Sequence, residues 1–509
     1  MATTDVGGAS PADATDEFDL LVIGGGINGA GIAREAAGRD LRVCLLEQHD
    51  LASHTSSAST KLIHGGLRYL EQGELRLVRE ALAERERLLA IAPHIIRPMR
   101  FVLPYVDGLR PRWLLRLGLF VYDHAGGREK LAASASTRLA DTPLGAPLLP
   151  ALRDGFEYSD CWVDDSRLVV LNALDAAQRG ATVMTRTRVS AARDSGGHWV
   201  VHAQDANGGH HRLRARAVVN ATGAWVNEVL DHMQVPARQR VRLVQGSHLI
   251  LRRLYGGDHA YLLQSPDQRV VFMIPYQQHY TLVGTTDVPY TGDPARPVIA
   301  DQERDYLLAC VNRFLREPVG TGDIRGSYSG VRPLYDSGEA AAQKVSRDYH
   351  LELQHGSTGA PVLSVYGGKI TTYRRLAEHA FGQLAPALGV EAQPWTALEP
   401  LPGGDLPGGD MTRFIEHSRA RWPGLPTELV DRLAHAHGTR LALLLGNARK
   451  PADLGRDFGA GLTEAEVRHL VRHEWARSAD DILWRRTRLG LALPGSAVHD
   501  LQDAVAKLL

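Results

Sequence analysis

The chain has 509 residues, which is long enough for more than one domain and a sizeable core. Lys plus Arg and Asp plus Glu both number 58, so the overall charge gives no indication of a nucleic-acid partner, and we predict none. Cys44, Cys161 and Cys310 have neither a CxxC spacing nor a metal-ligand spacing, which indicates a reducing compartment and no metal site.

The first readable elements form a βαβ unit. Residues 1–17 are small and acidic and lack an apolar core, so we expect a disordered tail and no signal peptide. The apolar run from Phe18 to Ile23 predicts a buried parallel strand. An Ala-rich helical pattern to about Ala37 follows, and then a second apolar strand that ends in Glu47.

Three glycines lie between the first strand and the helix. Gly24, Gly26 and Gly29 form G-x-G-x-x-G, in which the glycines permit a tight turn, backbone contact with a pyrophosphate and close helix–strand packing. Amides at the helix N-terminus would face the phosphates. Glu47, about 20 residues on, is at the position expected to accept ribose hydroxyls. The flanking strand, helix and acid favour a dinucleotide site over a plain glycine-rich turn.

Later segments predict a second sheet and a return to the first. After a helix in "LRLVREALAERERLLAIAPH", the segment "ATVMTRTRVSAAR" predicts one strand. Alternation in "RVRLVQGSHLIL", "RVVFMIPYQQ" and "HYTLVGTTDV" predicts an antiparallel sheet. The Pro- and Gly-rich "LEPLPGGDLPGGD" predicts a linker to a C-terminal helical domain, in which Thr463 and Glu466 match a capping box.

Two more glycine turns favour FAD as the cofactor. Thr222 and Gly223 end one predicted strand, and Gly367 and Gly368 end another that leads into a helix. The positive end of that helix would stabilise negative charge on a reduced flavin ring. A nicotinamide-linked dehydrogenase would usually complete its nucleotide domain early in the chain, whereas these turns lie far downstream.

The assembled motifs resemble the bacterial aerobic, FAD-dependent glycerol-3-phosphate dehydrogenases. The resemblance rests on "VIGGGINGAGIA", "TSSASTKLIHGGLRYLE", "GFEYSDCWVDDSRL", "QGSHLIL", "YSGVRPL" and "LSVYGGKITTYRRLAEHA", and it extends from Phe18 nearly to the C-terminus. The wider group of D-amino-acid-oxidase-like flavoproteins shares only the first and the late glycine motifs. The implied substrate is glycerol 3-phosphate.

The resemblance implies an α/β fold with a FAD-binding Rossmann-like domain interleaved with an antiparallel-sheet substrate domain, and a C-terminal all-helical domain. We predict the FAD-binding domain at about 18–90, 150–240 and 355–390. The substrate-binding cap would comprise about 91–149 and 241–354, and the helical domain 391–509.

A site for glycerol 3-phosphate needs fixed cations, because the substrate carries a phosphate dianion as well as two hydroxyls. The resemblance implies that Arg68, Arg332 and Lys369 hold the substrate and that His248 lies in the same pocket. His248 or Lys369 could act as the base, and the sequence does not decide between them. The predicted substrate contacts are His64, Arg68, Tyr69, Arg332, Lys369 and Thr372.

The predicted cofactor contacts come from three segments of the chain. Hydroxyls of the "TSSAST" segment suit a flavin edge or a pyrophosphate, although the segment could also be an ordinary polar loop. The predicted residues are Gly24, Gly26, Asn28, Gly29, Glu47, Ser56, Ser57, Thr60, Thr222, Gly223, Gly367, Gly368, Lys369, Ile370 and Thr371.

The resemblance implies that a membrane quinone accepts the electrons, at the inner face of the cell membrane. Because no apolar run is long enough to span a bilayer, contact would be peripheral. The segment 110–124, "RPRWLLRLGLFVYDH", mixes arginines with aromatics, which suits a headgroup layer. The same pattern would also fit a buried helix whose arginines face solvent.

The C-terminal segment "RHEWARSADDILWRRTRLGL" has acids and arginines one helical turn apart. We interpret it as structural, as part of a helical cap or of a dimer contact, and we expect a homodimer. Three other functions remain open: an oxidase that forms peroxide with oxygen, a nicotinamide-linked dehydrogenase and a non-catalytic flavoprotein. The compact segment "GVRPLYDSGEAAAQKV" favours a dehydrogenase over an oxidase.

Overall fold

The computed structural model describes residues 16–71, 73–267, 269–336 and 348–509. The predicted disordered tail lies almost entirely outside these residues, and the first strand begins at Asp16 instead of Phe18. Much of the compact segment that follows Arg332 also lies outside them.

The first sheet carries the dinucleotide motif. Within the described residues it consists of β1 (Asp16–Ile23), β2 (Val43–Leu46), β7 (Thr182–Met184), β8 (Thr187–Ser195), β9 (His198–Asp205), β10 (His210–Asn220), β17 (His350–His355) and β18 (Pro361–Tyr366). Its order is β17-β18-β10-β1-β2-β7, and the β8–β9 hairpin joins it at β10. The central strands run parallel and are buried, as their continuous apolar runs predict. Their glycine-rich turns therefore share one edge of the sheet.

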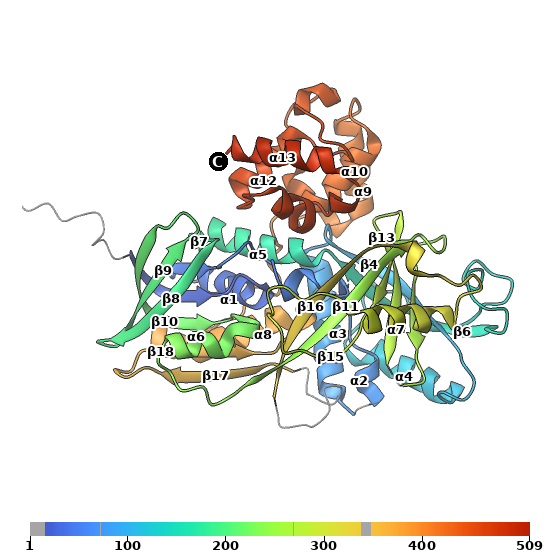
Figure 1. Cartoon of the computed structure of the whole chain (residues 1–509), viewed down its shortest axis with the longest axis horizontal. Helices are drawn as coiled ribbons and strands as arrows, with labels where there is room; N and C mark the ends of the chain where they lie inside the picture. Colours follow the sequence, from blue (N-terminus) through green and yellow to red (C-terminus); the bar gives the residue numbers. More distant parts are fainter. Residues whose placement is uncertain (1–15, 72, 268, 337–347) are drawn as a thin grey trace, which may run out of the picture.

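Helices cover both faces of this sheet (Figure 1). On one face α1 (Ile27–Ala37), α5 (Asp165–Gln178) and α8 (Tyr373–Leu388) pack together over an apolar core. On the other face α6 (Val226–His232) packs beside the β8–β9 hairpin. The single strand predicted over 181–193 is wrong: a turn at Arg186, with φ of 54°, divides it into β7 and β8.

The second sheet is antiparallel except where β12 pairs with β4. It consists, in the described residues, of β3 (Leu62–Ile63), β4 (Ile96–Pro104), β5 (Ala135–Arg138), β6 (Asp154–Val163), β11 (Val241–Arg252), β12 (Ala260–Gln264), β13 (Val270–Tyr276), β14 (Tyr280–Gly284), β15 (Val288–Pro289) and β16 (Ile324–Tyr335). Associated helices are α2 (Arg68–Glu71), α3 (Leu75–Ile91), α4 (Arg112–Ala125) and α7 (Asp301–Asn312). The sheets divide the chain differently from the predicted boundaries, since β3 and β6 pair in the second sheet.

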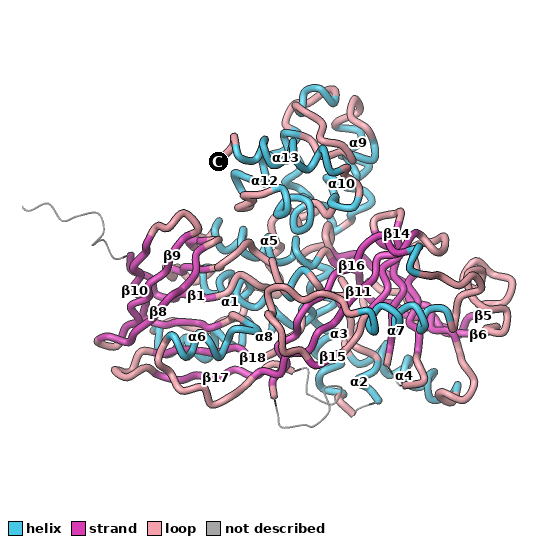
Figure 2. The backbone as a smooth tube through the Cα atoms, viewed as in Figure 1, coloured by secondary structure: helices cyan, strands magenta, loops and turns pink. Residues whose placement is uncertain are grey.

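The predicted C-terminal helical domain is confirmed and lies on the α5 side of the molecule (Figures 1 and 2). Its main helices are α9 (Met411–Arg421), α10 (Thr427–His437), α11 (Leu441–Leu445), α12 (Glu464–His473), the π-helix η9 (Asp481–Arg486) and α13 (Gly495–Ala506). Short 3-10 turns are η2 (Thr55–Ser57), η3 (Gly223–Trp225), η4 (Thr321–Asp323), η5 (Ile370–Thr372), η6 (Pro407–Gly409), η7 (Gly438–Arg440), η8 (Pro451–Leu454) and η10 (Leu489–Leu491). Only half of the predicted capping box forms: Thr463 caps α12, but the Glu466 carboxylate pairs with Arg432.

No helix in the described part of the chain combines the length and apolarity that a membrane span requires.

Candidate active site

The first glycine turn connects β1 to α1 and leaves no room for side chains. Gly24 has φ of +111°, and a Cβ there would lie 2.6 Å from the Ala221 carbonyl oxygen at the end of β10. A Cβ on Gly29 would lie 1.8 Å from the Gly24 carbonyl oxygen. Only glycine allows these approaches, so α1 packs directly on the turn. Gly26, the N-cap residue of α1, has no side chain of its own to cap the helix, and the Ile27 amide of the first turn donates to the Ser56 hydroxyl at 3.0 Å. The remaining first-turn amides suit a phosphate ligand.

A groove of about 160 Å³ follows this turn, and we call it the dinucleotide groove. It lies along the carboxyl ends of β1, β2, β10 and β18, where a doubly wound sheet binds its ligand. The Asn28 side chain joins its two sides by donating to the Gly367 carbonyl oxygen at 3.2 Å. The predicted cofactor residues that line it are Gly24, Gly26, Asn28, Glu47, Ser56, Thr222, Gly223, Gly367 and Gly368.

The other predicted cofactor residues lie outside the lining. Ser57 donates to the His54 carbonyl oxygen, and Thr60 lies within hydrogen-bond distance of His248. Ile370 packs against the core of the first sheet, and Thr371 accepts a hydrogen bond from the His64 amide. Thr60 and Lys369 instead lie toward the second cavity described below.

Glu47 is held as expected for a ribose acceptor. Its two carboxylate oxygens accept hydrogen bonds from the amides of Gly25 and His49, each at 2.7 Å. Burial raises the pKa of Glu47 to about 7, although the two amides act in the opposite direction. The folded apoprotein therefore holds this proton more tightly than the unfolded chain, and its free energy of unfolding falls as pH rises toward 7.

This pKa predicts that FAD affinity depends on pH. A ribose hydroxyl donates to an ionised Glu47, so binding competes with the proton. We expect the Kd for FAD to rise about tenfold from pH 8 to pH 6, as measured by fluorescence titration of the apoprotein. E47Q should bind FAD weakly with no such slope. An E47Q variant that keeps the wild-type slope would assign the titration to another group.

A second cavity, of about 910 Å³, lies between the second sheet and helices α2, α3 and α4. We call it the large cavity. His64, Arg68 and Tyr69 line it, as the substrate-site prediction requires of them. Thr372 lies in the lining of neither cavity because it is buried at the start of α8. Further polar lining comes from Arg110, Gln264, Ser265, Arg269, Thr285 and Asp287.

Arg332 and Lys369 lie between the two cavities. The Arg332 guanidinium pairs with Asp287 and donates to the Thr285 hydroxyl at 3.0 Å, and both partners line the large cavity. The next residue, Pro333, lines the dinucleotide groove. Lys369 follows Gly368 of the groove, and its Nζ lies 3.9 Å from the centre of the Tyr69 ring. Both cations are thus within reach of a substrate that meets a flavin between the cavities.

His248 lies at the same junction but is enclosed. Its Nε2 is 3.0 Å from the Thr60 hydroxyl, and its ring stacks on Tyr328 with centroids 4.8 Å apart. Burial, reinforced by the positive charges of Lys61 and Arg332, holds the pKa of His248 well below its usual value. The imidazole is therefore neutral near pH 7, and the same causes disfavour its protonated form. Nδ1 is buried and has no hydrogen-bond partner in the described part of the chain.

In the sequence, Lys61 stands close to His64 and Arg68 in the segment "KLIHGGLRYL". In the structure, His64 and Arg68 line the large cavity but Lys61 does not. Its side chain is buried and pairs with Asp165 at 3.1 Å, so it lines neither cavity. Burial, opposed by Asp165, lowers the pKa of Lys61 to about 8. The sequence analysis missed this pair and also Asp287, which pairs with Arg332, because no local pattern around Asp287 indicates the ion pair.

Comparison with known proteins adds family models that cover most of the chain. The model described as "FAD dependent oxidoreductase" matches residues 19–374. The model described as "C-terminal domain of alpha-glycerophosphate oxidase" matches residues 395–509. Residues 375–394 lie between the two matches, and the predicted linker, 398–410, lies at the start of the second.

Similar proteins carry closely related names. A glycerol-3-phosphate dehydrogenase of Pseudomonas aeruginosa is 51% identical over 95% of this chain and 94% of its own. A D-erythritol 1-phosphate dehydrogenase of Brucella abortus is 50% identical over 93% of this chain and 94% of its own. The crystal structure of a glycerol-3-phosphate dehydrogenase from Bacillus halodurans complexed with FAD is 28% identical, with a TM-score of 0.75, and the match covers 97% of this chain and 90% of that one.

Proposed function

Since this chain belongs to the family of FAD-dependent oxidoreductases that includes the bacterial glycerol-3-phosphate dehydrogenases, we propose that it oxidises sn-glycerol 3-phosphate to dihydroxyacetone phosphate. The observation that carries the proposal is the junction of the two cavities, where two cations and a neutral imidazole gather. Bound FAD would supply the hydride acceptor, its N5, for the hydrogen on C2 of the substrate.

Residues of this chain would bind the substrate, stabilise charge on it and take up its hydroxyl proton. Arg332 and Lys369 would bind the phosphate and the glycerol oxygens, and they would stabilise alkoxide character on the C2 oxygen. Arg68 lines the large cavity and would add a third positive charge. The base would be His248 or Lys369: the His248 imidazole is neutral near pH 7, but the burial that lowers its pKa also weakens it as a proton acceptor.

The test is anaerobic reduction of the bound flavin. Purified holoenzyme is mixed with sn-glycerol 3-phosphate without oxygen, and absorbance of the flavin band is followed. Rapid bleaching is expected. A parallel reaction with D-erythritol 1-phosphate, the substrate named for the Brucella relative, decides which polyol phosphate is preferred. A yellow protein that neither compound bleaches would refute the substrate assignment.

The electron acceptor is a separate part of the proposal. We propose a membrane quinone, reached by peripheral association at the cytoplasmic face of the cell membrane. The rival acceptor is oxygen, and the family model of the C-terminal domain carries the name of an oxidase. Reoxidation of the reduced enzyme by a soluble quinone analogue should exceed reoxidation by air-saturated buffer. Stoichiometric peroxide at the turnover rate would instead identify an oxidase.

Helix α4 supports the membrane part of this proposal. Trp113, Leu117 and Phe120 lie on one side of the helix and are 68%, 51% and 53% exposed. Arg112 and Arg116 belong to the same helix, so a basic surface borders an apolar one. A buried helix with its arginines in solvent would not expose these apolar side chains. The helix also borders the large cavity, which is a suitable route for an apolar acceptor.

Removing the exposed aromatics should weaken membrane binding. We expect W113S/F120S to lower the partition coefficient onto anionic vesicles by about tenfold or more, because two apolar side chains leave the headgroup layer. Vesicle pelleting measures this, and flavin bleaching by substrate should persist. L443S is the matched control, since Leu443 is 69% exposed in the C-terminal domain. Equal pelleting of all three proteins would exclude α4 as the contact.

We also propose a homodimer, on the family resemblance alone. Analytical ultracentrifugation of the holoenzyme would test it, and a monomer at micromolar concentration would exclude it.

A further inference from the structure

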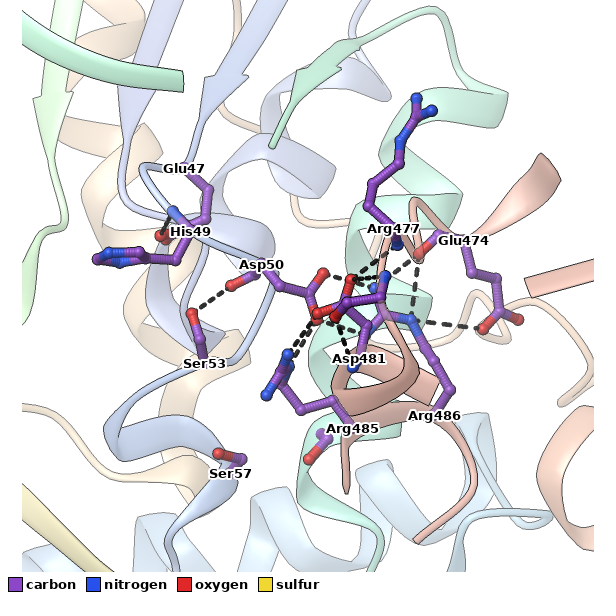
Figure 3. A network of polar contacts seen from close by, with 12 residues as sticks. Glu47, His49, Asp50, Ser53, Ser57, Glu474, Arg477, Asp481, Arg485 and Arg486 are labelled. Carbon is purple, nitrogen blue, oxygen red and sulfur yellow. Dashed lines mark hydrogen bonds and ion pairs between the residues drawn. The ribbon is translucent and has the colours of Figure 1, made fainter. Parts of the chain in front are cut away.

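Arginines of one short segment make part of the contact between the C-terminal domain and the rest of the chain, beside other contacts such as the buried ion pair of Arg167 with Glu474. This segment comprises η9 and the two residues after it, 487 and 488, and we call it the arginine segment. Figure 3 shows Arg485 and Arg486 of this segment facing Asp50, which follows β2 in the FAD-binding domain. The sequence prediction gave this segment a structural role within its own domain, but its arginines reach across the domain boundary.

The first anchor is Asp50. Arg486 donates to both oxygens of Asp50, at 2.9 and 2.8 Å, and Arg485 adds a contact of 2.6 Å. Asp50 and Arg486 are both almost completely buried. Asp50 lies three residues after Glu47, whose carboxylate accepts a hydrogen bond from the Gly25 amide in the first glycine turn. The anchor therefore fixes the start of the loop that runs from residue 48 to residue 61.

The second anchor reaches the end of the same loop. Arg488 donates to Asp164 at 2.9 Å and pairs with buried Asp165. Asp165 in turn accepts from the Ser59 hydroxyl at 2.6 Å and from Lys61 at 3.1 Å. A chain of buried hydrogen bonds thus leads from the C-terminal domain to residues 59 and 61.

Between the two anchors, the loop supplies residues to both parts of the site. Ser56 lines the dinucleotide groove and accepts from the Ile27 amide at the N-terminus of α1, at 3.0 Å. Thr60 lies 3.0 Å from Nε2 of His248. Loops at cofactor sites open easily unless they are tied to a rigid body, because they bury little apolar surface of their own. Here the loop is held by ion pairs of Arg486 and Arg488, which belong to the C-terminal helical domain.

We propose that the arginine segment clamps the loop 48–61 from both ends and so holds FAD in its groove. Arg486 and Arg488 act as positioning residues: they touch neither cavity, and they act through Asp50 and Asp165. The C-terminal domain then has a direct part in cofactor retention. The proposal depends on FAD binding alone, so a test of it does not depend on the identity of the substrate or of the electron acceptor.

The test compares FAD affinity in folded apoproteins. FAD is removed from wild type, R486M and R488M, circular dichroism confirms folding at the working temperature, and the Kd for FAD is measured by fluorescence. We expect the Kd to rise at least tenfold in each variant, and R488K, which keeps the charge, to give an intermediate Kd. R432M is the matched control, because Arg432 pairs with Glu466 inside the C-terminal domain and away from the loop. Its Kd should stay within about twofold of wild type.

A measurement on wild type keeps the proposal testable if a variant fails to fold. Binding that is coupled to the clamp must be reciprocal, so FAD should slow amide hydrogen exchange in residues 481–488 as well as in 48–61. Exchange in α9, which lines neither cavity, should not change. The proposal is overturned if FAD leaves exchange in 481–488 unaltered, or if folded R486M and R488M bind FAD as tightly as wild type.

Discussion

Replacing Arg332 by Ala is expected to lower kcat/KM for sn-glycerol 3-phosphate by about 10³-fold while FAD remains bound. Two effects act in the same direction. The variant loses a fixed guanidinium that would bind the substrate anion and stabilise charge on the C2 oxygen. It also removes the guanidinium that pairs with Asp287, whose side chain is largely buried, so the carboxylate charge at the cavity wall is no longer offset by Arg332. A negative wall would repel a phosphate.

Two further variants separate these effects. R332K keeps a positive charge but cannot donate to Thr285 and Asp287 together, so it should recover only part of the loss. R332A/D287N also removes the negative charge of Asp287, and its gain over R332A measures the contribution of that charge. R269A is the control, because Arg269 lines the same cavity but pairs with Asp267. Steady-state kinetics with a quinone analogue gives all four values, and normal efficiency in FAD-loaded R332A would remove Arg332 from the mechanism.

The elements that local patterns describe were predictable from the sequence. A continuous apolar run before a glycine turn identified β1, and the Thr-Gly turn marked the end of β10. The glycine spacing identified the edge of the sheet that carries the groove. Each of these signals spans fewer than about 20 residues, and each follows from backbone geometry at a glycine. The split between β7 and β8 was missed, because a left-handed turn at Arg186 has no such residue signature.

Side-chain partners across long sequence separations were not predictable. Lys61 looked like His64 and Arg68 because the three stand together in one segment, yet its partner Asp165 lies far along the chain. The spacing of acids and arginines in the segment 472–491 predicted pairs one helical turn apart, but Arg488 pairs with Asp164 and Asp165. Charge pairing of this kind depends on which elements the fold brings together, and a local hydrophobic period in the sequence does not predict it. The sequence therefore predicted residues that line the groove but not the residues that support them.

The second large effect concerns the cofactor: G29A is expected to raise the Kd for FAD by about 10²-fold. The added methyl would lie 1.8 Å from the Gly24 carbonyl oxygen, so α1 must move away from the turn that binds the pyrophosphate. That movement withdraws the first-turn amides of α1 from the phosphates. FAD content after gel filtration and the Kd of the apoprotein would measure the loss.

A glycine in another helix provides the matched control. Gly382 lies in α8, and an added Cβ there would have no neighbour within 4 Å. G382A should therefore bind FAD normally and should unfold at a slightly higher temperature, because Ala is the better helix former by about 1 kcal/mol. The contrast separates contact with the turn from the general effect of a methyl group in a helix. If G29A and G382A bound FAD equally well, the close approach of α1 to the turn would not be what holds the pyrophosphate.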